Sequence, residues 1–279
     1  MPHLTSRRRA RAVAWAGASL VLASLLAKFG GVTVTESARA PAPVGAILLA
    51  LETVVLLLLL RAETMGADRR RRMATLRMRP LRARTALLLA PVPVLMYLTS
   101  AGYVIARGGL GGPGAVEPGA TFQVTVGAVW SRALLVPIVE EFLLRGWAQR
   151  SLERALGATP AVVIVALTFA ALHGAAAGFP WHILAAGLAL GIVARVTRSI
   201  WACVLVHAGN NALALLLPTQ FPRWGIPDTA ALAHWMTLES TRHAAAAVAI
   251  GAGALLTAAI FHLSREARTP WPVARRSGS

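Results

Sequence analysis

The chain has 279 residues, of which 56% are hydrophobic and 14% are charged, and its formal net charge is +17. Soluble domains are about half apolar and about a quarter charged, so this composition indicates a polytopic membrane protein. A nucleic-acid partner is not expected, because the arginines cluster at the ends of apolar runs and no nucleic-acid-binding motif accompanies them. The single cysteine, Cys203, excludes an internal disulfide and a cysteine-cluster metal site.

Apolar runs separated by charged or Pro- and Gly-rich segments predict an all-α transmembrane helix bundle of about eight spans. The runs fall at residues 12–29, 44–60, 85–105, 121–144, 160–177, 181–196, 200–217 and 244–263. The first run could instead be a signal peptide, because residues 38–40 resemble a small-residue cleavage site. Its length and the proline at position 41 favour a retained span. Pro91 and Pro93 predict a kink in the third span.

The distribution of basic residues predicts that both termini are cytoplasmic. With that orientation 22 basic residues lie inside and five outside, and Arg132 lies within a span. Residues 61–84 hold nine arginines and are expected to form a cytoplasmic loop that contacts anionic lipid, with a DNA-binding arm as the weaker alternative. In the outer loop before the last span, residues 230–238 are predicted to form a short interfacial helix.

Three charged residues end the fourth span in the pattern Glu140-Glu141-x-x-x-Arg145. A charge near mid-bilayer costs about 2.5–3.5 kcal/mol on insertion scales, so such groups usually face a protein-lined cavity and have a function. Glu141 and Arg145 are one helical turn apart and are expected to pair. Glu140 lies about 100° further round the helix, so it does not share that partner.

Few other strongly polar residues lie deep in the later spans. The fifth span carries His173, and the seventh carries His207, Asn210 and Asn211. His207 and Asn211 are four residues apart and share one helical face. Each residue alone could be a buried polar group whose hydrogen bonds are all made within the protein. Together with Glu140 they form a Glu/His/His/Asn set on three helices, which indicates an active site in the cytoplasmic half of the membrane.

These residues resemble the three motifs of the CPBP family, the CAAX-protease and bacteriocin-processing group also called Abi, which includes the type II CAAX prenyl endopeptidase. The motifs are Glu140-Glu141-x-x-x-Arg145, Phe169-x-x-x-His173 and His207-x-x-x-Asn211. The resemblance covers about residues 120–217, the expected catalytic core. Residues 1–119 then form an N-terminal transmembrane region, and residues 218–279 hold the outer loop, the last span and a basic tail.

The resemblance implies a membrane-embedded endopeptidase that acts on a membrane-associated protein or peptide. It implies that Glu140 is the base that activates water and that His173 orients or shares this water. His207 and Asn211 would stabilise the tetrahedral oxyanion, for which ring and amide N–H groups are suitable donors. Glu141 and Arg145 would organise the site. Prenylated CAAX proteins are mainly eukaryotic, so for a bacterial chain a leader peptide or a membrane-anchored peptide is the expected substrate.

Several alternatives remain open. Two histidines and a glutamate could bind zinc with an open fourth position, but the His-Glu-x-x-His motif is absent, so no cofactor is expected and zinc is the second choice. Cys203, His207 and Asn211, spaced by four residues, superficially suggest a thiol nucleophile, although a buried thiol is usually inert. Serine and aspartyl protease chemistry are disfavoured because their motifs are missing. A transporter or a non-catalytic immunity or assembly factor could use the same polar cluster.

Overall fold

The structure is a computed structural model that describes residues 77–108, 124, 126–173 and 179–266, with a few helical positions between 10 and 21. The rest of the first two predicted spans, most of the basic loop at 61–84 and the end of the tail lie outside the described residues. Within the described part every regular element is a helix, apart from an isolated bridge between Met78 and Ser199. The prediction of an all-α fold is confirmed.

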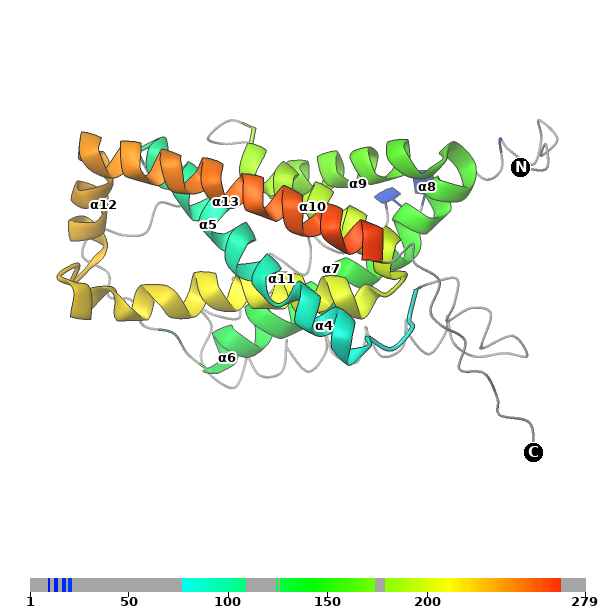
Figure 1. Ribbon diagram of the computed structural model, residues 1–279, viewed down its shortest axis with the longest axis horizontal. Coiled ribbons are helices and arrows are strands. Elements are labelled where there is room, and N and C mark those ends of the chain that lie inside the picture. The colour runs from blue at the N-terminus through cyan, green and yellow to red at the C-terminus, as the bar shows by residue number, and fades with distance from the viewer. Residues whose placement is uncertain are drawn as a thin grey trace.

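The helices follow the predicted apolar runs closely, and Figure 1 shows them packed as an elongated bundle. The main ones are α4 (Ala83–Leu89), α5 (Pro91–Ala106), α9 (Ala158–Leu172), α10 (Trp181–Thr197), α11 (Ile200–Leu216) and α13 (Glu239–Glu266). Three stretches are long and apolar enough to cross a membrane: Ala83–Ala106, Ile200–Trp224 and Glu239–Arg265. Two shorter apolar helices, α9 and α10, lie among them. The chain is therefore a membrane protein.

The fourth predicted span, residues 121–144, continues into a longer helical rod that ends at Leu156, in which α-helical and wider π-helical turns alternate. Its segments are α6 (Val126–Ala128), η1 (Val129–Leu135), α7 (Val136–Glu141), η2 (Phe142–Ala148) and α8 (Gln149–Leu156). The short α7 lies between two π-helical segments and ends at Glu141. Turns of π-helix are rare and often occur at functional sites, because the extra residue in the turn redirects the side chains that follow.

The third predicted span is divided where its prolines begin. The segment α4 ends at Leu89, Ala90 keeps a helical backbone, and Pro91 begins α5. Proline is accepted at the first position of a helix because its missing N–H has no partner there. The ring of Pro93, two residues further on, packs so tightly against α11 that a Cβ on Gly209 would lie 2.9 Å from it. The absence of a side chain at Gly209 therefore permits the close contact of α5 with α11.

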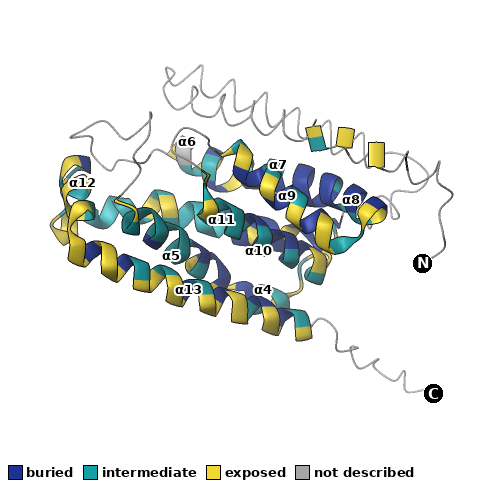
Figure 2. Ribbon diagram, turned by 90° about the horizontal axis from the view of Figure 1, so that it is seen from above, coloured by how far each residue is buried: buried dark blue, intermediate teal, exposed yellow. Residues whose placement is uncertain are grey.

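The last helix, α13, lies along α5, and glycine permits the close approach of the two backbones. Figure 2 shows a long exposed face on α13, whereas the buried residues gather around α7, α8, α9 and α10. The exposed residues on α13 include large apolar side chains such as Ile250 and Phe261. An apolar outer surface of this kind suits contact with lipid. The short helix predicted at residues 230–238 is present as α12 (Thr229–Thr237) and is capped by Asp228.

Replacing Gly102 with alanine is expected to destabilise the α5–α13 contact. A Cβ at this position would lie 2.7 Å from the carbonyl oxygen of Ala245 and 3.0 Å from the backbone of Ala249. Forcing the helices apart should cost about 1–3 kcal/mol, the usual penalty for overpacking. Gly253→Ala is the matched control, because its Cβ would meet Thr99 at an ordinary distance of 3.7 Å. Thermal unfolding in detergent should show a lower midpoint for Gly102→Ala alone, and equal midpoints would contradict the prediction.

Candidate active site

Two adjacent carboxylates at the end of α7 form the centre of the candidate site. Glu140 is only 6% exposed and Glu141 is fully buried. Successive residues on a helix point about 100° apart, so the two carboxylates face different neighbours although both are inside the bundle. Burying two carboxylates is costly unless each is neutralised or bonded. The surrounding side chains therefore decide what each can do.

Glu141 pairs with Arg145 as the spacing predicts. Arg145 Nη1 donates to Glu141 Oε1 at 3.0 Å, and neither side chain is exposed. The second terminal nitrogen of Arg145 donates to the carbonyl oxygen of Gly187 on α10 at 3.3 Å. The Phe169 ring on α9 lies beneath the guanidinium, with 4.7 Å between the guanidinium carbon and the ring centroid. Arg145 thus connects three helices.

His207 on α11 lies between the two carboxylates. Its Nδ1 is 2.9 Å from Glu141 Oε1, and its Nε2 is 3.8 Å from Glu140 Oε2. A carboxylate oxygen accepts, so Nδ1 carries the proton and donates to Glu141. In the neutral ring Nε2 then has a free lone pair directed at Glu140, and in the charged ring it carries a second N–H. Glu141 therefore fixes the orientation of His207 as well as binding Arg145.

Glu141 accepts from Arg145 and His207 through Oε1, and its buried Oε2 has no hydrogen-bond partner among the described residues. The described contacts give Glu140 no such donor. Among the described residues its buried Oε2 has no hydrogen-bond partner. The 3.8 Å to His207 is short enough for charge attraction and too long for a hydrogen bond. Separations of this kind between polar groups are often bridged by water. Glu140 is thus the carboxylate that remains available for a ligand or a water molecule.

His173 joins the cluster through Phe169. It is exposed at the C-terminal end of α9, and its Nδ1 donates to the carbonyl oxygen of Phe169 at 2.8 Å. That bond leaves the Nε2 of the neutral ring as an acceptor. The Phe169 ring contacts both imidazoles, with centroids 4.4 Å from His173 and 5.8 Å from His207. The described contacts connect His173 to Glu140 only through this ring.

Asn211 lies one turn beyond His207, and its amide nitrogen donates to the backbone oxygen of Arg132 in η1 at 2.9 Å. Its side-chain oxygen accepts from Asn210 at 3.3 Å. An amide nitrogen carries two N–H groups, so one remains to serve a ligand. The expectation that Glu140, His173, His207 and Asn211 contact one another directly is met only by Glu140 and His207 among the described contacts.

Several residues outside the predicted set contribute to the site. Phe169 supplies the ring between the histidines, Gly187 supplies a carbonyl acceptor, and Gln149 donates to the carbonyl of Gly191 at 3.0 Å. The sequence feature that could have predicted these contacts is a stripe of polar residues at every fourth position, from Glu141 to Glu153. This stripe faces Gly187 and Gly191, which are also four residues apart on α10. A purely α-helical stripe would rotate by about 120° over three such steps. The wider π-helical turns offset this rotation and keep the stripe on one face.

Cys203 lies in the packed core near this site. Its side chain is fully buried, and Sγ is 3.4 Å from the carbonyl oxygen of Leu190. A thiol donating to a backbone oxygen inside an apolar core is a poor nucleophile. This placement disfavours the arrangement of Cys203, His207 and Asn211 as a catalytic triad. Among the described residues no group of three or more His, Cys, Asp or Glu side chains is arranged to hold a metal ion.

Comparison with known families identifies the segment that holds this cluster. Residues 122–213 match the family model described as type II CAAX prenyl endopeptidase Rce1-like. This Rce1-like segment is 92 of the 279 residues, and over that length the chain is similar to the CAAX proteases of the family. All six predicted site residues, from Glu140 to Asn211, lie within the Rce1-like segment. The searches of curated proteins and of solved structures gave no match.

The match places the polar cluster within a segment that is similar to known proteases. The matched family is one of CAAX proteases, as expected for a membrane-embedded protease. The matched segment runs from just before α6 to near the end of α11. It therefore includes every helix that contributes a side chain to the cluster: α7, α9 and α11, together with the π-helical segment η2.

Proposed function

We propose that this chain is an intramembrane endopeptidase that hydrolyses a peptide bond of a membrane-associated protein or peptide, using water activated by Glu140. The observation that carries the proposal is the Glu140 carboxylate. It is buried, its Oε2 lacks a partner among the described residues, and it faces His207 Nε2 at 3.8 Å. Burying a carboxylate without a protein donor is costly, and charged groups kept inside a membrane protein usually have a function. General base catalysis is the function that the match to the protease family favours.

The charges of the cluster support this role for Glu140. With His207 neutral, the two carboxylates and Arg145 carry a net charge of −1, and one additional proton on His207 makes the cluster neutral. When Glu140 takes a proton from the attacking water, the cluster gains one positive charge, and the oxyanion that forms on the substrate carbonyl carries the matching negative charge. Glu140 then gives the proton to the departing amine nitrogen as the C–N bond breaks. No net charge is created inside the membrane at any stage.

The oxyanion requires hydrogen-bond donors, for which we assign His207 and Asn211. A charged His207 offers its Nε2–H, and Asn211 offers the amide N–H that does not bind Arg132. Removing one such donor usually lowers the rate by about 10²–10³-fold. His173, whose Nε2 is an acceptor, would orient the attacking water. Glu141 and Arg145 hold His207 in position and do not take part in proton transfer.

The substrate class follows from the location of the site and from the family. A site enclosed by apolar helices is reached most easily by a segment that is already attached to the bilayer. We infer that the partners are the lipid bilayer and a leader peptide or membrane-anchored peptide, with no nucleic acid. The direct test is to incubate the purified protein in liposomes with anchored candidate peptides and to detect the new N-terminus. Solute uptake without cleavage would favour the transporter alternative.

A metal-independent reaction is the expected outcome of a chelation experiment. Glu140 already supplies a base, and His207 and Asn211 supply donors for the mechanism above, so zinc is not required by the chemistry. The cleavage rate should be unchanged after exhaustive dialysis against a chelator and after addition of zinc. A rate that is lost on dialysis and restored only by zinc would establish the zinc-dependent alternative with the same residues.

We further propose eight spans in the cell membrane with both termini in the cytoplasm. The five apolar helical stretches and the excess of arginine at one end of them support this topology. A cysteine placed at the exposed Arg154 should be protected from a membrane-impermeant maleimide in intact cells, and one placed at Arg223 should be labelled. The background is Cys203→Ala, since Cys203 is buried. Labelling of position 154 in intact cells would reverse the orientation.

A further inference from the structure

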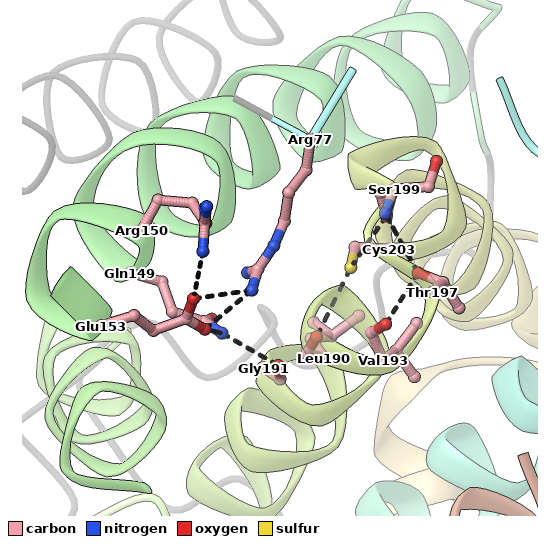
Figure 3. A network of polar contacts seen from close by, with 10 residues as sticks. All are labelled: Arg77, Gln149, Arg150, Glu153, Leu190, Gly191, Val193, Thr197, Ser199 and Cys203. Atoms are coloured by element: carbon pink, nitrogen blue, oxygen red, sulfur yellow. Dashed lines mark hydrogen bonds and ion pairs between the residues drawn. The ribbon is translucent and has the colours of Figure 1, made fainter. Parts of the chain in front are cut away.

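A second polar network lies at the far end of the catalytic rod, outside the cluster around Glu140 (Figure 3). Its centre is Arg77, which precedes α4 and extends to Glu153 on α8. Arg77 Nη2 lies 2.8 Å from each carboxylate oxygen of Glu153, and both side chains are less than a tenth exposed. Hydrogen bonds between ionised partners are about twice as strong as neutral ones and hold a defined geometry. The pair joins positions that are 76 residues apart in the sequence.

The backbone beside Arg77 is fixed to the turn between α10 and α11. The N–H of Ile200 donates to the carbonyl of Arg77 at 2.8 Å, and the Ser199 hydroxyl donates to the carbonyl of Arg79 at 2.7 Å. Arg77 itself has a left-handed backbone with φ of 60°, which costs a non-glycine residue about 1–2 kcal/mol. Strain of this size persists only where surrounding contacts determine the conformation. The backbone of residues 77–79 is therefore held firmly against the bundle.

The network continues from Glu153 toward the active site. Glu153 accepts from Gln149 at 3.0 Å, and Gln149 donates to the carbonyl of Gly191 on α10 at 3.0 Å. One turn earlier on both helices, Arg145 makes the same kind of contact with Gly187. The rod is thus bonded to α10 at two points one turn apart. The first of these two points is Arg145, which also binds Glu141.

Close packing makes this connection stiff. A Cβ on Gly187 would lie 3.1 Å from the backbone of Ala166 on α9, and a Cβ on Gly191 would lie 2.9 Å from Val162. The helices α9 and α10 therefore touch at both carbonyls that accept from the rod. Burial by itself would raise the pKa of Glu153, but the charge of Arg77 and hydrogen bonds from its neighbours hold that pKa below its ordinary value. Glu153 remains an anion, so the contact with Arg77 persists at neutral pH.

We propose that Arg77 is a positioning residue for proteolysis. By holding Glu153 it keeps α8 in register against α10, which keeps Arg145 on the Gly187 carbonyl and Glu141 on His207. Arg77 is too far along the rod to be one of the reacting groups, so its loss should affect the rate of the chemical step more than substrate binding. The segment that carries the basic cytoplasmic loop is thereby coupled to the active site. This inference rests on the proposed function.

The test compares Arg77→Lys with Arg79→Ala in the full-length protein. Lysine keeps the charge, but its side chain ends one atom short of Nη2, the nitrogen of Arg77 that contacts both carboxylate oxygens. We expect kcat to fall about tenfold with KM within twofold, which corresponds to about 1.4 kcal/mol. Arg79 is exposed on the same segment, so Arg79→Ala, which removes a full positive charge there, should leave kcat unchanged. Wild-type kcat in a folded Arg77→Lys protein would overturn the proposal.

A second variant separates positioning from stability. Arg77→Met combined with Glu153→Gln removes both buried charges together, which often leaves stability nearly unchanged. If the double variant is as stable as the wild-type protein but has a low kcat, Arg77 is a positioning residue. If both its thermal midpoint and its kcat return to the wild-type values, Arg77 contributes to stability alone. Hydrogen exchange of peptides covering residues 142–156 gives a readout that needs no substrate. Faster exchange there in Arg77→Lys would support the coupling even if the wild-type protein cleaved no peptide, and unchanged exchange would contradict it.

Discussion

Glu140→Gln is expected to lower peptide cleavage by about 100-fold or more, the usual contribution of a general base, while the protein still inserts and folds. Glutamine has nearly the same shape but cannot accept a proton from water. Because Glu140 Oε2 has no protein partner among the described residues, no hydrogen bond needed for folding is lost. The measurement is the initial rate of cleavage of a membrane-anchored peptide in liposomes, compared with the wild-type rate.

Glu239→Gln provides the matched control, since Glu239 is exposed at the start of α13 and should be replaceable without effect. The inactive Glu140→Gln protein is also a substrate trap. Peptides that co-purify with it and not with the wild-type protein would identify the natural substrate. Undiminished cleavage by Glu140→Gln would remove Glu140 as the base and require a new assignment of the site.

Arg145→Met should produce the largest loss of stability in the site, together with loss of activity. It leaves Glu141 buried and without its charged partner, and breaking a buried pair in this way typically costs about 3–5 kcal/mol. His207 would also lose the fixed carboxylate that orients its ring. Thermal unfolding in detergent should show a strongly lowered midpoint, and the cleavage rate should fall with it.

The double variant Glu141→Gln/Arg145→Met distinguishes folding from catalysis. Both buried charges are removed, so much of the stability lost in Arg145→Met should return. Activity should not return, because a neutral amide at position 141 no longer favours the charged His207 that we assign as an oxyanion donor. A double variant with wild-type activity would show that this buried pair serves the fold alone.

The pairing within the catalytic rod was predictable, whereas the contacts between helices were not. Glu141 and Arg145 are four residues apart on one helix, and helix geometry alone brings such residues together. The bond from His207 to Glu141 is different, because it depends on how α11 is rotated and how far it is shifted along α7. The sequence pattern predicts that Glu141 and Arg145 organise the site but does not reveal that Glu141 also orients His207. One N–H of the Asn211 amide donates to the Arg132 backbone, a contact that the sequence does not mark.

The π-helical segments explain part of this difference. Sequence patterns assume 3.6 residues per turn, and η1 and η2 depart from that value on either side of α7. Each departure changes the direction of the side chains that follow. The stripe from Glu141 through Gln149 to Glu153 stays on one face for this reason. Its partners on α10 are backbone carbonyls, which no sequence motif marks.

The sequence by itself determined the membrane environment, the order and approximate extent of most helices within the described residues, the division of the third span at Pro91 and the pair of Glu141 with Arg145. These features depend on apolar length, on proline and on spacing within one helix, which are local properties of the chain. Only the tertiary structure decided that His207 lies between the two carboxylates, that Phe169 separates the two histidines, and that Arg77 holds Glu153. Each of these contacts requires the relative rotation and register of separate helices, which are set by packing of the whole bundle.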